Sequence, residues 1–229
     1  MAIWDHHLDK LYKDFKKNGH RGSTFQKTFS GGSIKHFYDA TPKDERLELV
    51  KDPDFGNLPK LHGYSQSTLR SLFYIRQIEK YFDPKVVKHM TDFGAGYGNF
   101  VRVFDAIFKT RSYSIVDFPK VQEIQKEYLD FCGIEVEYGE TMNDLSDFDS
   151  PALFVATHSL SECPLEVREE VEKILPRYEY IYIVYNSKID KINNVEYFEK
   201  LSKRLSESYT TEINFNELTA KRSLIAVKK

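Results

Sequence analysis

The fold is decided by the stretch Thr91-Asp92-Phe93-Gly94-Ala95-Gly96-Tyr97-Gly98-Asn99. Residues 86–93 have the pattern of a short strand, and residues 99–108 have the apolar spacing of a helix. The three glycines occupy alternating positions, and without Cβ atoms they permit a tight turn and direct contact between the backbone and a ligand. The first turn of the following helix offers that ligand unpaired N–H groups. The stretch therefore predicts a strand, a ligand-binding turn and a helix.

The same alternation of strand and helix continues to residue 205. Strand patterns cover residues 113–117, 134–138, 152–156 and 180–185, and helix patterns cover residues 119–131, 164–175 and 195–205. Two further strands, 209–215 and 223–227, leave no room for a crossover helix, so each must pair antiparallel with the other or with a neighbour. These units predict an α/β fold with a doubly wound sheet and a C-terminal antiparallel hairpin.

The N-terminal part does not follow this alternation. We predict that residues 1–83 form a helical N-terminal cap and that the α/β domain covers residues 84–229. Residues 19–42 have the glycine, serine and threonine content of a long loop, and a second helix begins after them with Ser65 or Ser67 as its N-cap. The apolar face of the first helix carries Trp4, Leu8, Leu11, Tyr12 and Phe15.

The composition of the 229-residue chain is that of a globular protein, with 41% hydrophobic and 30% charged residues. The 33 Lys and Arg residues and 35 Asp and Glu residues give a formal charge of −2, which disfavours a nucleic-acid partner. Cys132 and Cys163 have neither metal-ligand spacing nor the pattern of a disulfide scaffold. No apolar run has the roughly 20 residues of a membrane helix, and the first residues lack a signal-peptide pattern. We therefore expect a soluble, cytoplasmic protein with no membrane partner, whose oligomeric state the sequence leaves open.

Two kinds of nucleoside ligand use a glycine turn of this type. The dinucleotide fingerprint Gly-x-Gly-x-x-Gly needs its third glycine at the position of Asn99. The pattern Gly-x-Gly-x-Gly, with the acidic Asp92 two residues before it, instead resembles motif I of the class I methyltransferases that use S-adenosylmethionine (SAM). Asp117 ends the next strand, where a carboxylate accepts the ribose hydroxyls of SAM or of NAD equally well. Its alternative role is to cap the helix that begins at Pro119, and the alternative for the turn is a connection without a ligand.

Further features also resemble methyltransferases. Asp117-Phe118-Pro119 resembles the Asp-Leu-Pro of many small-molecule O-methyltransferases, and the terminal strands resemble the last two strands of the methyltransferase fold. The resemblance covers residues 84–229 and implies a Rossmann-like, seven-stranded methyltransferase fold. Ser67-Thr68-Leu69-Arg70 together with His158-Ser159-Leu160-Ser161-Glu162 resembles sugar O-methyltransferases. The implied activity is methyl transfer from SAM to a hydroxyl of a sugar or another small polyhydroxylated molecule.

The resemblance also implies a set of SAM contacts. The glycines would line the methionine and ribose parts, Asp92 would face the ammonium group, and Asp117 would bind the ribose hydroxyls. The loop that begins with Glu140 would cover the adenine, and a methionine there packs either on the purine or in the core. The implied cofactor-binding residues are Asp92, Gly94, Ala95, Gly96, Gly98, Asp117, Phe118, Thr141, Met142 and Thr157.

Catalysis is expected just beyond the carboxyl ends of the strands. A sugar hydroxyl becomes a good nucleophile when it loses its proton, which needs a general base or a metal ion. His158 and Glu162 follow the fourth strand: His158 can accept a proton near neutral pH, and Glu162 can either orient His158 or act as the base itself. Their alternative roles are structural, since His158 can end the strand and Glu162 can stabilise the first turn of a helix. We read Asp144, Asp147 and Asp149 as a solvated acidic loop rather than a magnesium site, and we predict no metal.

Substrate contacts are expected from the cap and from the segment after the fourth strand. Arg70 and Tyr74 are one helical turn apart and can face a site together, although an ordinary surface position explains Arg70 equally well. The expected substrate-binding residues are Tyr64, Gln66, Ser67, Arg70, Tyr74 and Ser159.

Two other functions fit part of the pattern. An NAD(P)-dependent oxidoreductase is disfavoured by Asn99 and by the lack of a second nucleotide-binding half. A SAM-binding, methyltransferase-like protein without catalysis is disfavoured by His158 and Glu162, which accompany a complete glycine turn.

Overall fold

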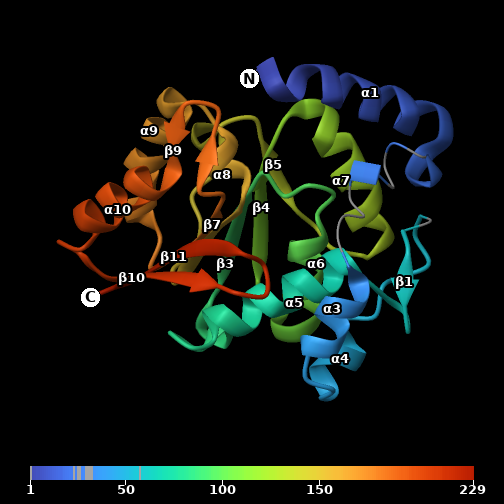
Figure 1. Cartoon of the computed structure of the whole chain (residues 1–229), viewed down its shortest axis with the longest axis horizontal. Coiled ribbons are helices and arrows are strands. Elements are labelled where there is room, and N and C mark those ends of the chain that lie inside the picture. The colour runs from blue at the N-terminus through green and yellow to red at the C-terminus, as the bar shows by residue number, and fades with distance from the viewer. Residues whose placement is uncertain (1, 23, 25–26, 29–32, 57) are drawn as a thin grey trace. The chain divides into compact units, whose positions relative to one another are not determined.

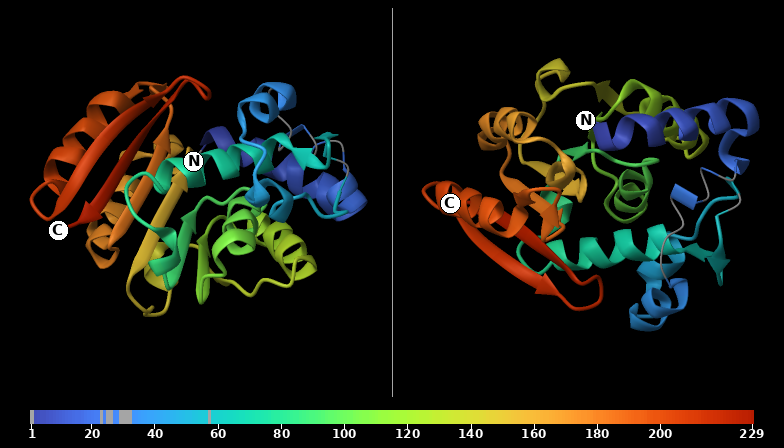
Figure 2. Two further views of the ribbon diagram at one scale, coloured as in Figure 1. Left: turned by 90° about the horizontal axis from the view of Figure 1, so that it is seen from below. Right: turned by 45° about the horizontal axis from the view of Figure 1, so that its top comes forward.

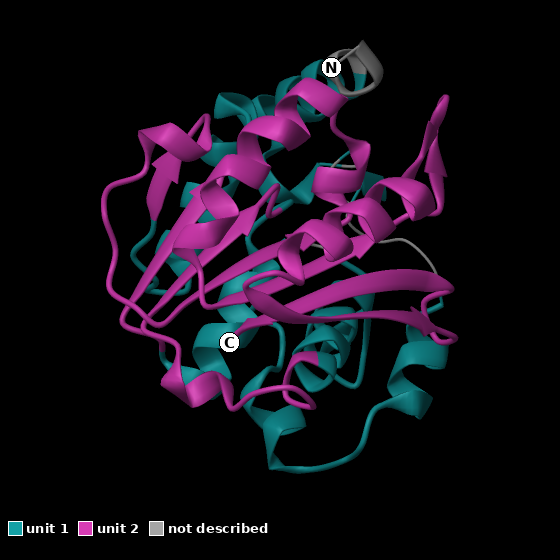
Figure 3. Ribbon diagram, turned by 90° about the vertical axis from the view of Figure 1, so that its left-hand side faces the viewer, with its two compact units in different colours: residues 1–77, 96–109, 118–136 teal, residues 78–95, 110–117, 137–229 magenta. Residues whose placement is uncertain are grey.

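The structure is a computed structural model that describes residues 2–22, 24, 27–28, 33–56 and 58–229. The chain divides into two compact units, which Figure 3 distinguishes by colour. Unit 1 comprises residues 1–77, 96–109 and 118–136, and unit 2 comprises residues 78–95, 110–117 and 137–229. Each unit is assembled from several stretches of sequence. The division into a cap of residues 1–83 and a SAM-binding domain of residues 84–229 stays a prediction.

Unit 2 contains a seven-stranded sheet with the order β10-β11-β7-β6-β3-β4-β5 (Figure 1). The strands from β5 to β7 are parallel, while β11 is antiparallel to both of its neighbours. This sheet confirms the predicted α/β fold class. Its strands are β3 (His89–Phe93), β4 (Ser112–Val116), β5 (Glu137–Gly139), β6 (Ala152–Thr157), β7 (Tyr180–Tyr185), β10 (Tyr209–Asn216) and β11 (Lys221–Lys228).

The interior of unit 2 explains the apolar run of β6. Phe154 and Ala156 belong to one face of the sheet, where they join a core cluster with Val171 of α9 (Leu165–Ile174) and Phe198 of α10 (Asn194–Leu205). Leu153 and Val155, on the opposite face, are also fully buried. Both faces of β6 are therefore excluded from water, which is the environment that a continuously apolar strand requires.

The strand order reverses at β3. From β3 the chain proceeds outward to β4 and β5, and from β6 onward the strands lie on the other side of β3. Ligands of open α/β sheets bind beyond the carboxyl ends of the strands at such a reversal. In unit 2 this edge carries Asp92 near the end of β3 and Thr157 at the end of β6.

The last two strands form a long hairpin that lies beside α10 in both views of Figure 2. They pair in register from Tyr209 opposite Lys228 to Asn216 opposite Lys221. The pair confirms the antiparallel hairpin predicted for residues 209–227. Its placement puts β11, the last strand in the sequence, between β7 and β10.

Unit 1 is mainly helical and includes the short antiparallel pair β1 (Lys60–Leu61) and β2 (Tyr64–Ser65). The predicted first and second helices are present, and Ser65 is the N-cap of the second because its Oγ accepts the N–H of Thr68 at 3.2 Å. On the first helix Leu8, Leu11 and Phe15 are buried, whereas the side chain of Trp4 lies outside the described residues. The helices are α1 (Ala2–Asn18), α3 (Ile34–Ala40), α4 (Glu45–Leu49), α5 (Gln66–Ile78), α6 (Asn99–Phe108) and α7 (Pro119–Phe131).

Three local predictions were wrong. The strand expected at 86–93 begins only at His89, because Pro84–Val86 forms a 3-10 helix. The loop expected over residues 19–42 contains α3, because the Ser33 side chain accepts the N–H of His36 as an N-cap and Phe37 is buried. The strand expected at 134–138 is present only as β5, from residue 137. The N–H of Ile134 still donates to the carbonyl of Leu129, which closes the end of α7 and delays the strand.

Among the described residues, no helix combines the length and the apolar character needed to span a bilayer.

Candidate functional site

The carboxyl edge of the sheet in unit 2 holds a buried carboxylate. Asp92, the residue before the end of β3, is 0% exposed. Neither of its carboxylate oxygens has a hydrogen-bond partner among the described residues. Burial, with a further contribution from the charge of Asp117, raises the pKa of Asp92 to about 8. An ionised carboxylate in this position requires a cation or a hydrogen-bond donor from a ligand.

Asp117 lies at the same edge of the sheet. It follows β4, which is parallel to β3 with Phe93 opposite Val116. The backbone N–H of Gly94 donates to the carbonyl of Val116 at 2.8 Å, and that of Asp117 donates to Gly139 at 3.2 Å. The N-cap of α7 is Phe118, whose side chain is 40% exposed, and not Asp117. The backbone of the half-buried Asp117 is therefore held in place beside β4 and β5.

The glycine turn adopts the left-handed conformation that its sequence requires, with φ values of 70°, 61° and 91° at Gly94, Gly96 and Gly98. A Cβ atom on Gly94 would lie 2.2 Å from the Cβ of Ser159, within unit 2. A Cβ atom on Gly98 would lie 2.9 Å from the side chain of Leu129, within unit 1. Backbone conformation and packing alone therefore explain why these two positions are glycine. The buried Asp92, which has no partner among the described residues, is the stronger indication of a ligand.

The segment after β6 has a strained backbone. His158 has a φ of 80°, a region in which residues other than glycine are uncommon. The strain is held in place because the N–H of His158 donates to Val184 of β7 at 2.8 Å and Ser161 Oγ donates to the carbonyl of His158 at 2.6 Å. Ser159 Oγ also donates to the carbonyl of Phe93. Such strain is frequent at functional sites.

Glu162 ends the short helix α8 (Ser159–Glu162) and takes part in a polar chain. Its Oε1 accepts from Asn186 Nδ2 at 3.2 Å, and Asn186 Oδ1 accepts from Lys221 Nζ at 2.5 Å. All three side chains are partly exposed. The ammonium group of Lys221 is thus linked to the carboxylate of Glu162 through the amide of Asn186. Glu162 lies at the same edge of the sheet as Asp92. Asn186 and Lys221 belong to no motif of the sequence, so they were not among the predicted site residues.

A buried arginine fixes the chain after α8. Arg168 is 0% exposed, and burial lowers the pKa of its guanidinium. Its Nε donates to Cys163 O at 2.8 Å, its Nη2 to Ser161 O at 2.7 Å and its Nη1 to Asn194 Oδ1 at 2.8 Å. These bonds hold the backbone on both sides of Glu162, at Ser161 and Cys163. Arg168 was not among the predicted residues, although an arginine on the apolar face of a helix is a sequence signal for a buried charge.

The loop after β5 is closed by its own side chains. The pKa of Asp144 is lowered by hydrogen bonds that its Oδ2 accepts from the N–H and Oγ1 of Thr141, at 2.7 and 3.0 Å, and from the N–H of Glu140 at 3.0 Å. Thr141 is exposed. Met142 is 5% exposed and packs in the core of unit 2 with Val116. The side chain of Met142 therefore contacts the protein interior, and its contact with adenine stays a prediction.

Two further aspartates of this loop form ion pairs. Asp147 pairs with Arg177 at 2.9 Å, and Asp149 pairs with Arg111 at 2.8 Å. Within the described parts of the chain, no group of three or more His, Cys, Asp or Glu side chains has an arrangement that holds a metal ion.

The predicted substrate residues of the cap lie in unit 1, and all except Arg70 are buried. Ser67 Oγ accepts from Asn99 Nδ2 at 3.4 Å, so this hydroxyl is engaged inside the unit. Arg70 is half-buried on α5. In unit 2, the edge of the sheet brings together Asp92, Gly94, Ala95, Asp117, Thr157, His158, Ser159 and Glu162. The roles of both groups stay predictions.

Solved structures show the same fold. The mitomycin 7-O-methyltransferase MmcR matches with a TM-score of 0.51 and 14% identity, over 99% of this chain and 68% of that one. The methyltransferase domain of bacterial CtHen1 matches with a TM-score of 0.52 and 11% identity, over 69% and 97% of the two chains. An rRNA methylase from Streptococcus thermophilus matches with a TM-score of 0.50 and 18% identity, over 70% and 95%. No family model matches the sequence, and no curated protein matches it. The chain therefore has the Rossmann-like methyltransferase fold.

Proposed function

We propose that this protein binds SAM at the carboxyl edge of its sheet and transfers the methyl group to a hydroxyl of a small polyhydroxylated molecule such as a sugar. The observation that carries the proposal is the carboxylate of Asp92, which is buried, unpartnered among the described residues and directly before the glycine turn. A buried charge is costly unless it is paired. The ammonium group of SAM is a cation that would supply the missing partner.

The neighbouring residues fit the rest of the nucleoside. Asp117 is half-buried and follows the adjacent strand, where a carboxylate can accept the two ribose hydroxyls. The lone antiparallel strand β11 between β7 and β10 also supports SAM over NAD, because plain dinucleotide-binding sheets lack it.

The residues after β6 support catalysis. When bound, SAM supplies an electrophilic methyl group on its sulfonium, so the protein has to align the acceptor oxygen and take its proton. His158 and Glu162 are the candidate bases: hydrogen bonds to β7 and to Ser161 fix the backbone of His158, and Asn186 donates to the carboxylate of Glu162. The sugar specificity rests on the sequence resemblance of the segments that contain Ser67 and His158.

Thermal unfolding in the presence of four ligands tests the proposal. SAM and S-adenosylhomocysteine should raise the melting temperature, whereas NAD and NADP should not, because a ligand stabilises only the state that binds it. Stabilisation by NAD alone would overturn the assignment. The acceptor class is tested with methyl-labelled SAM and a panel of sugars, glycosides, catechols and amines. If amines but no sugars became labelled, the proposed O-methylation of a sugar would be rejected, and the proposed SAM binding would still hold.

A further inference from the structure

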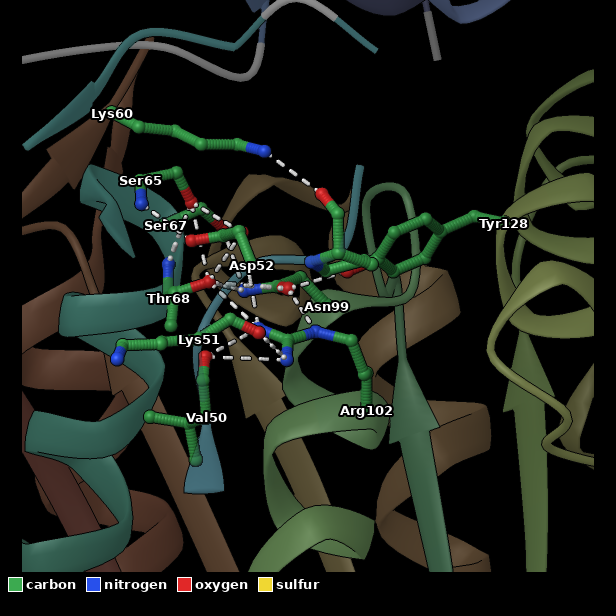
Figure 4. A network of polar contacts seen from close by, with 11 residues as sticks. Val50, Lys51, Asp52, Lys60, Ser65, Ser67, Thr68, Asn99, Arg102 and Tyr128 are labelled. Atoms are coloured by element: carbon green, nitrogen blue, oxygen red, sulfur yellow. Dashed lines mark hydrogen bonds and ion pairs between the residues drawn. The ribbon is translucent and has the colours of Figure 1, made fainter. Parts of the chain in front are cut away.

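Unit 1 contains a buried network of polar side chains centred on Arg102 of α6 (Figure 4). Arg102 is 6% exposed. Its guanidinium donates to the carbonyls of Val50 and Lys51 at 3.3 and 3.2 Å, and to Thr68 Oγ1 at 2.8 Å. The network therefore joins α6 to the segment at 50–52 and to the first turn of α5.

The charge of Arg102 is balanced by Asp52, whose carboxylate is 3.8 Å away. The two side chains are 7% and 5% exposed. Asp52 also accepts from Ser65 Oγ at 3.0 Å and from Thr68 Oγ1 at 2.8 Å. A buried ion pair is tolerated when further hydrogen bonds satisfy its remaining atoms, and the removal of one member leaves an uncompensated charge.

The same network holds the residue that follows the glycine turn. Asn99 Oδ1 accepts from Arg102 Nε at 3.0 Å and from Tyr128 OH at 2.9 Å. The carbonyls of the turn are also engaged, since Gly98 O accepts the N–H of Arg102 at 3.2 Å and Gly96 O accepts from Gln125 Nε2 at 2.9 Å. The backbone of α6 and the side chain of Gln125 on α7 thus hold the second half of the turn, while Arg102 and Tyr128 hold the side chain of Asn99, the first residue of α6.

We propose that Asp52, Arg102 and Tyr128 are positioning residues for SAM: they hold Asn99, and with it the backbone of residues 96–98, in the conformation that accepts the cofactor. Glycines have little conformational preference of their own, so their neighbours decide the shape of this turn. The inference rests on the proposed function. It extends the SAM-binding machinery to residues 50–68, which precede the predicted SAM-binding domain.

Two matched substitutions test the proposal. Tyr128→Phe removes the hydroxyl that donates to Asn99, and the control Tyr209→Phe removes a hydroxyl that donates to Leu175 O and Tyr178 O at 3.2 and 2.8 Å in unit 2. Both tyrosines are 2% exposed, and each variant loses only one oxygen atom. We expect similar losses of unfolding free energy. SAM affinity by calorimetry should fall about fivefold in Tyr128→Phe and less than about twofold in Tyr209→Phe.

Asp52→Asn provides a second variant of unchanged shape, which removes the charge opposite Arg102. Its KM for SAM should rise while kcat at saturating SAM stays near that of the wild type, a split that a general loss of folded protein does not produce. Wild-type protein that binds no SAM would reject the proposed function itself. Wild-type protein that binds SAM, together with unchanged affinity in Tyr128→Phe and Asp52→Asn, would overturn only the positioning role.

Discussion

The binding of SAM should release a proton, because Asp92 must ionise to pair with a cation. Its pKa of about 8 means that the carboxyl group is protonated in the free protein at neutral pH. The ionised fraction rises from about 1% at pH 6 to about 9% at pH 7, so SAM affinity should increase about ninefold over this interval. The ammonium group of SAM stays protonated here, since an α-amino group has a pKa of about 8.

Isothermal titration calorimetry at pH 6.5 in buffers of different ionisation enthalpy counts the released protons. The expected value is close to one proton per SAM. Asp92→Asn is the matched control, because it keeps the shape of the side chain and cannot ionise. This variant should bind SAM more weakly and release fewer protons. Equal affinity at pH 6 and pH 7, or the same proton count in Asp92→Asn, would refute the assignment of Asp92 as the partner of the cation.

Four further predictions concern residues of unit 2, which also contains Asp92. Asp117→Ala should weaken SAM binding by at least about tenfold through the loss of charge-assisted hydrogen bonds, whereas His158→Ala should bind SAM normally and lose methyl transfer. Gly94→Ala should lower the unfolding free energy by about 1–3 kcal/mol, because its Cβ would lie 2.2 Å from the Cβ of Ser159 at a positive φ. Burial lowers the pKa of His89 to about 4. The neutral imidazole therefore contributes to stability above pH 6.5, and this contribution is lost as the pH falls toward 4. In urea unfolding, the stability advantage of the wild type over His89→Gln should shrink by about 2 kcal/mol between pH 6.5 and 4.5.

Each of these predictions has an outcome that contradicts it. Normal turnover in His158→Ala would exclude His158 as the general base. Unchanged SAM affinity in Asp117→Ala would exclude Asp117 as the residue that binds the ribose. Gly94→Ala should cost less unfolding free energy in a Ser159→Gly background than in the wild type, and an equal cost in both backgrounds would show that the clash is not the cause. An advantage over His89→Gln that is the same at both pH values would mean that His89 titrates normally.

Much of the fold was predictable because its signals are local. The strand before the glycine turn, the apolar run of β6 and the two closely spaced terminal strands each specify their conformation within a few residues. The insertion of β11 between β7 and β10 was not specified, because strand order depends on contacts between distant segments. The helix α3 was missed because its cap, Ser33, and its single buried residue, Phe37, stand in a glycine-rich and serine-rich region.

The candidate site was predictable only in part. Asp92 was predicted from the glycine motif and Asp117 from its position after the next strand. The sequence does not reveal that the carboxylate of Asp92 is buried and has no partner among the described residues. Arg102 and Asp52 are 50 positions apart, so no spacing rule relates them. The apolar neighbours of Arg102 in residues 100–104 were the available hint, because a charge inside an apolar helix needs a buried partner.

The position of β11 also has a consequence for biosynthesis. A ribosome releases β7 and β10 before β11, so the nascent sheet stays open along one side of β7 until residues 221–228 emerge. During that interval the backbone of residues 180–185 offers unpaired N–H and C=O groups next to the apolar Ile181 and Ile183, an edge on which other chains readily aggregate. Chaperone dependence and misassembly of truncated chains should therefore concentrate in the interval before residues 221–228 emerge from the ribosome.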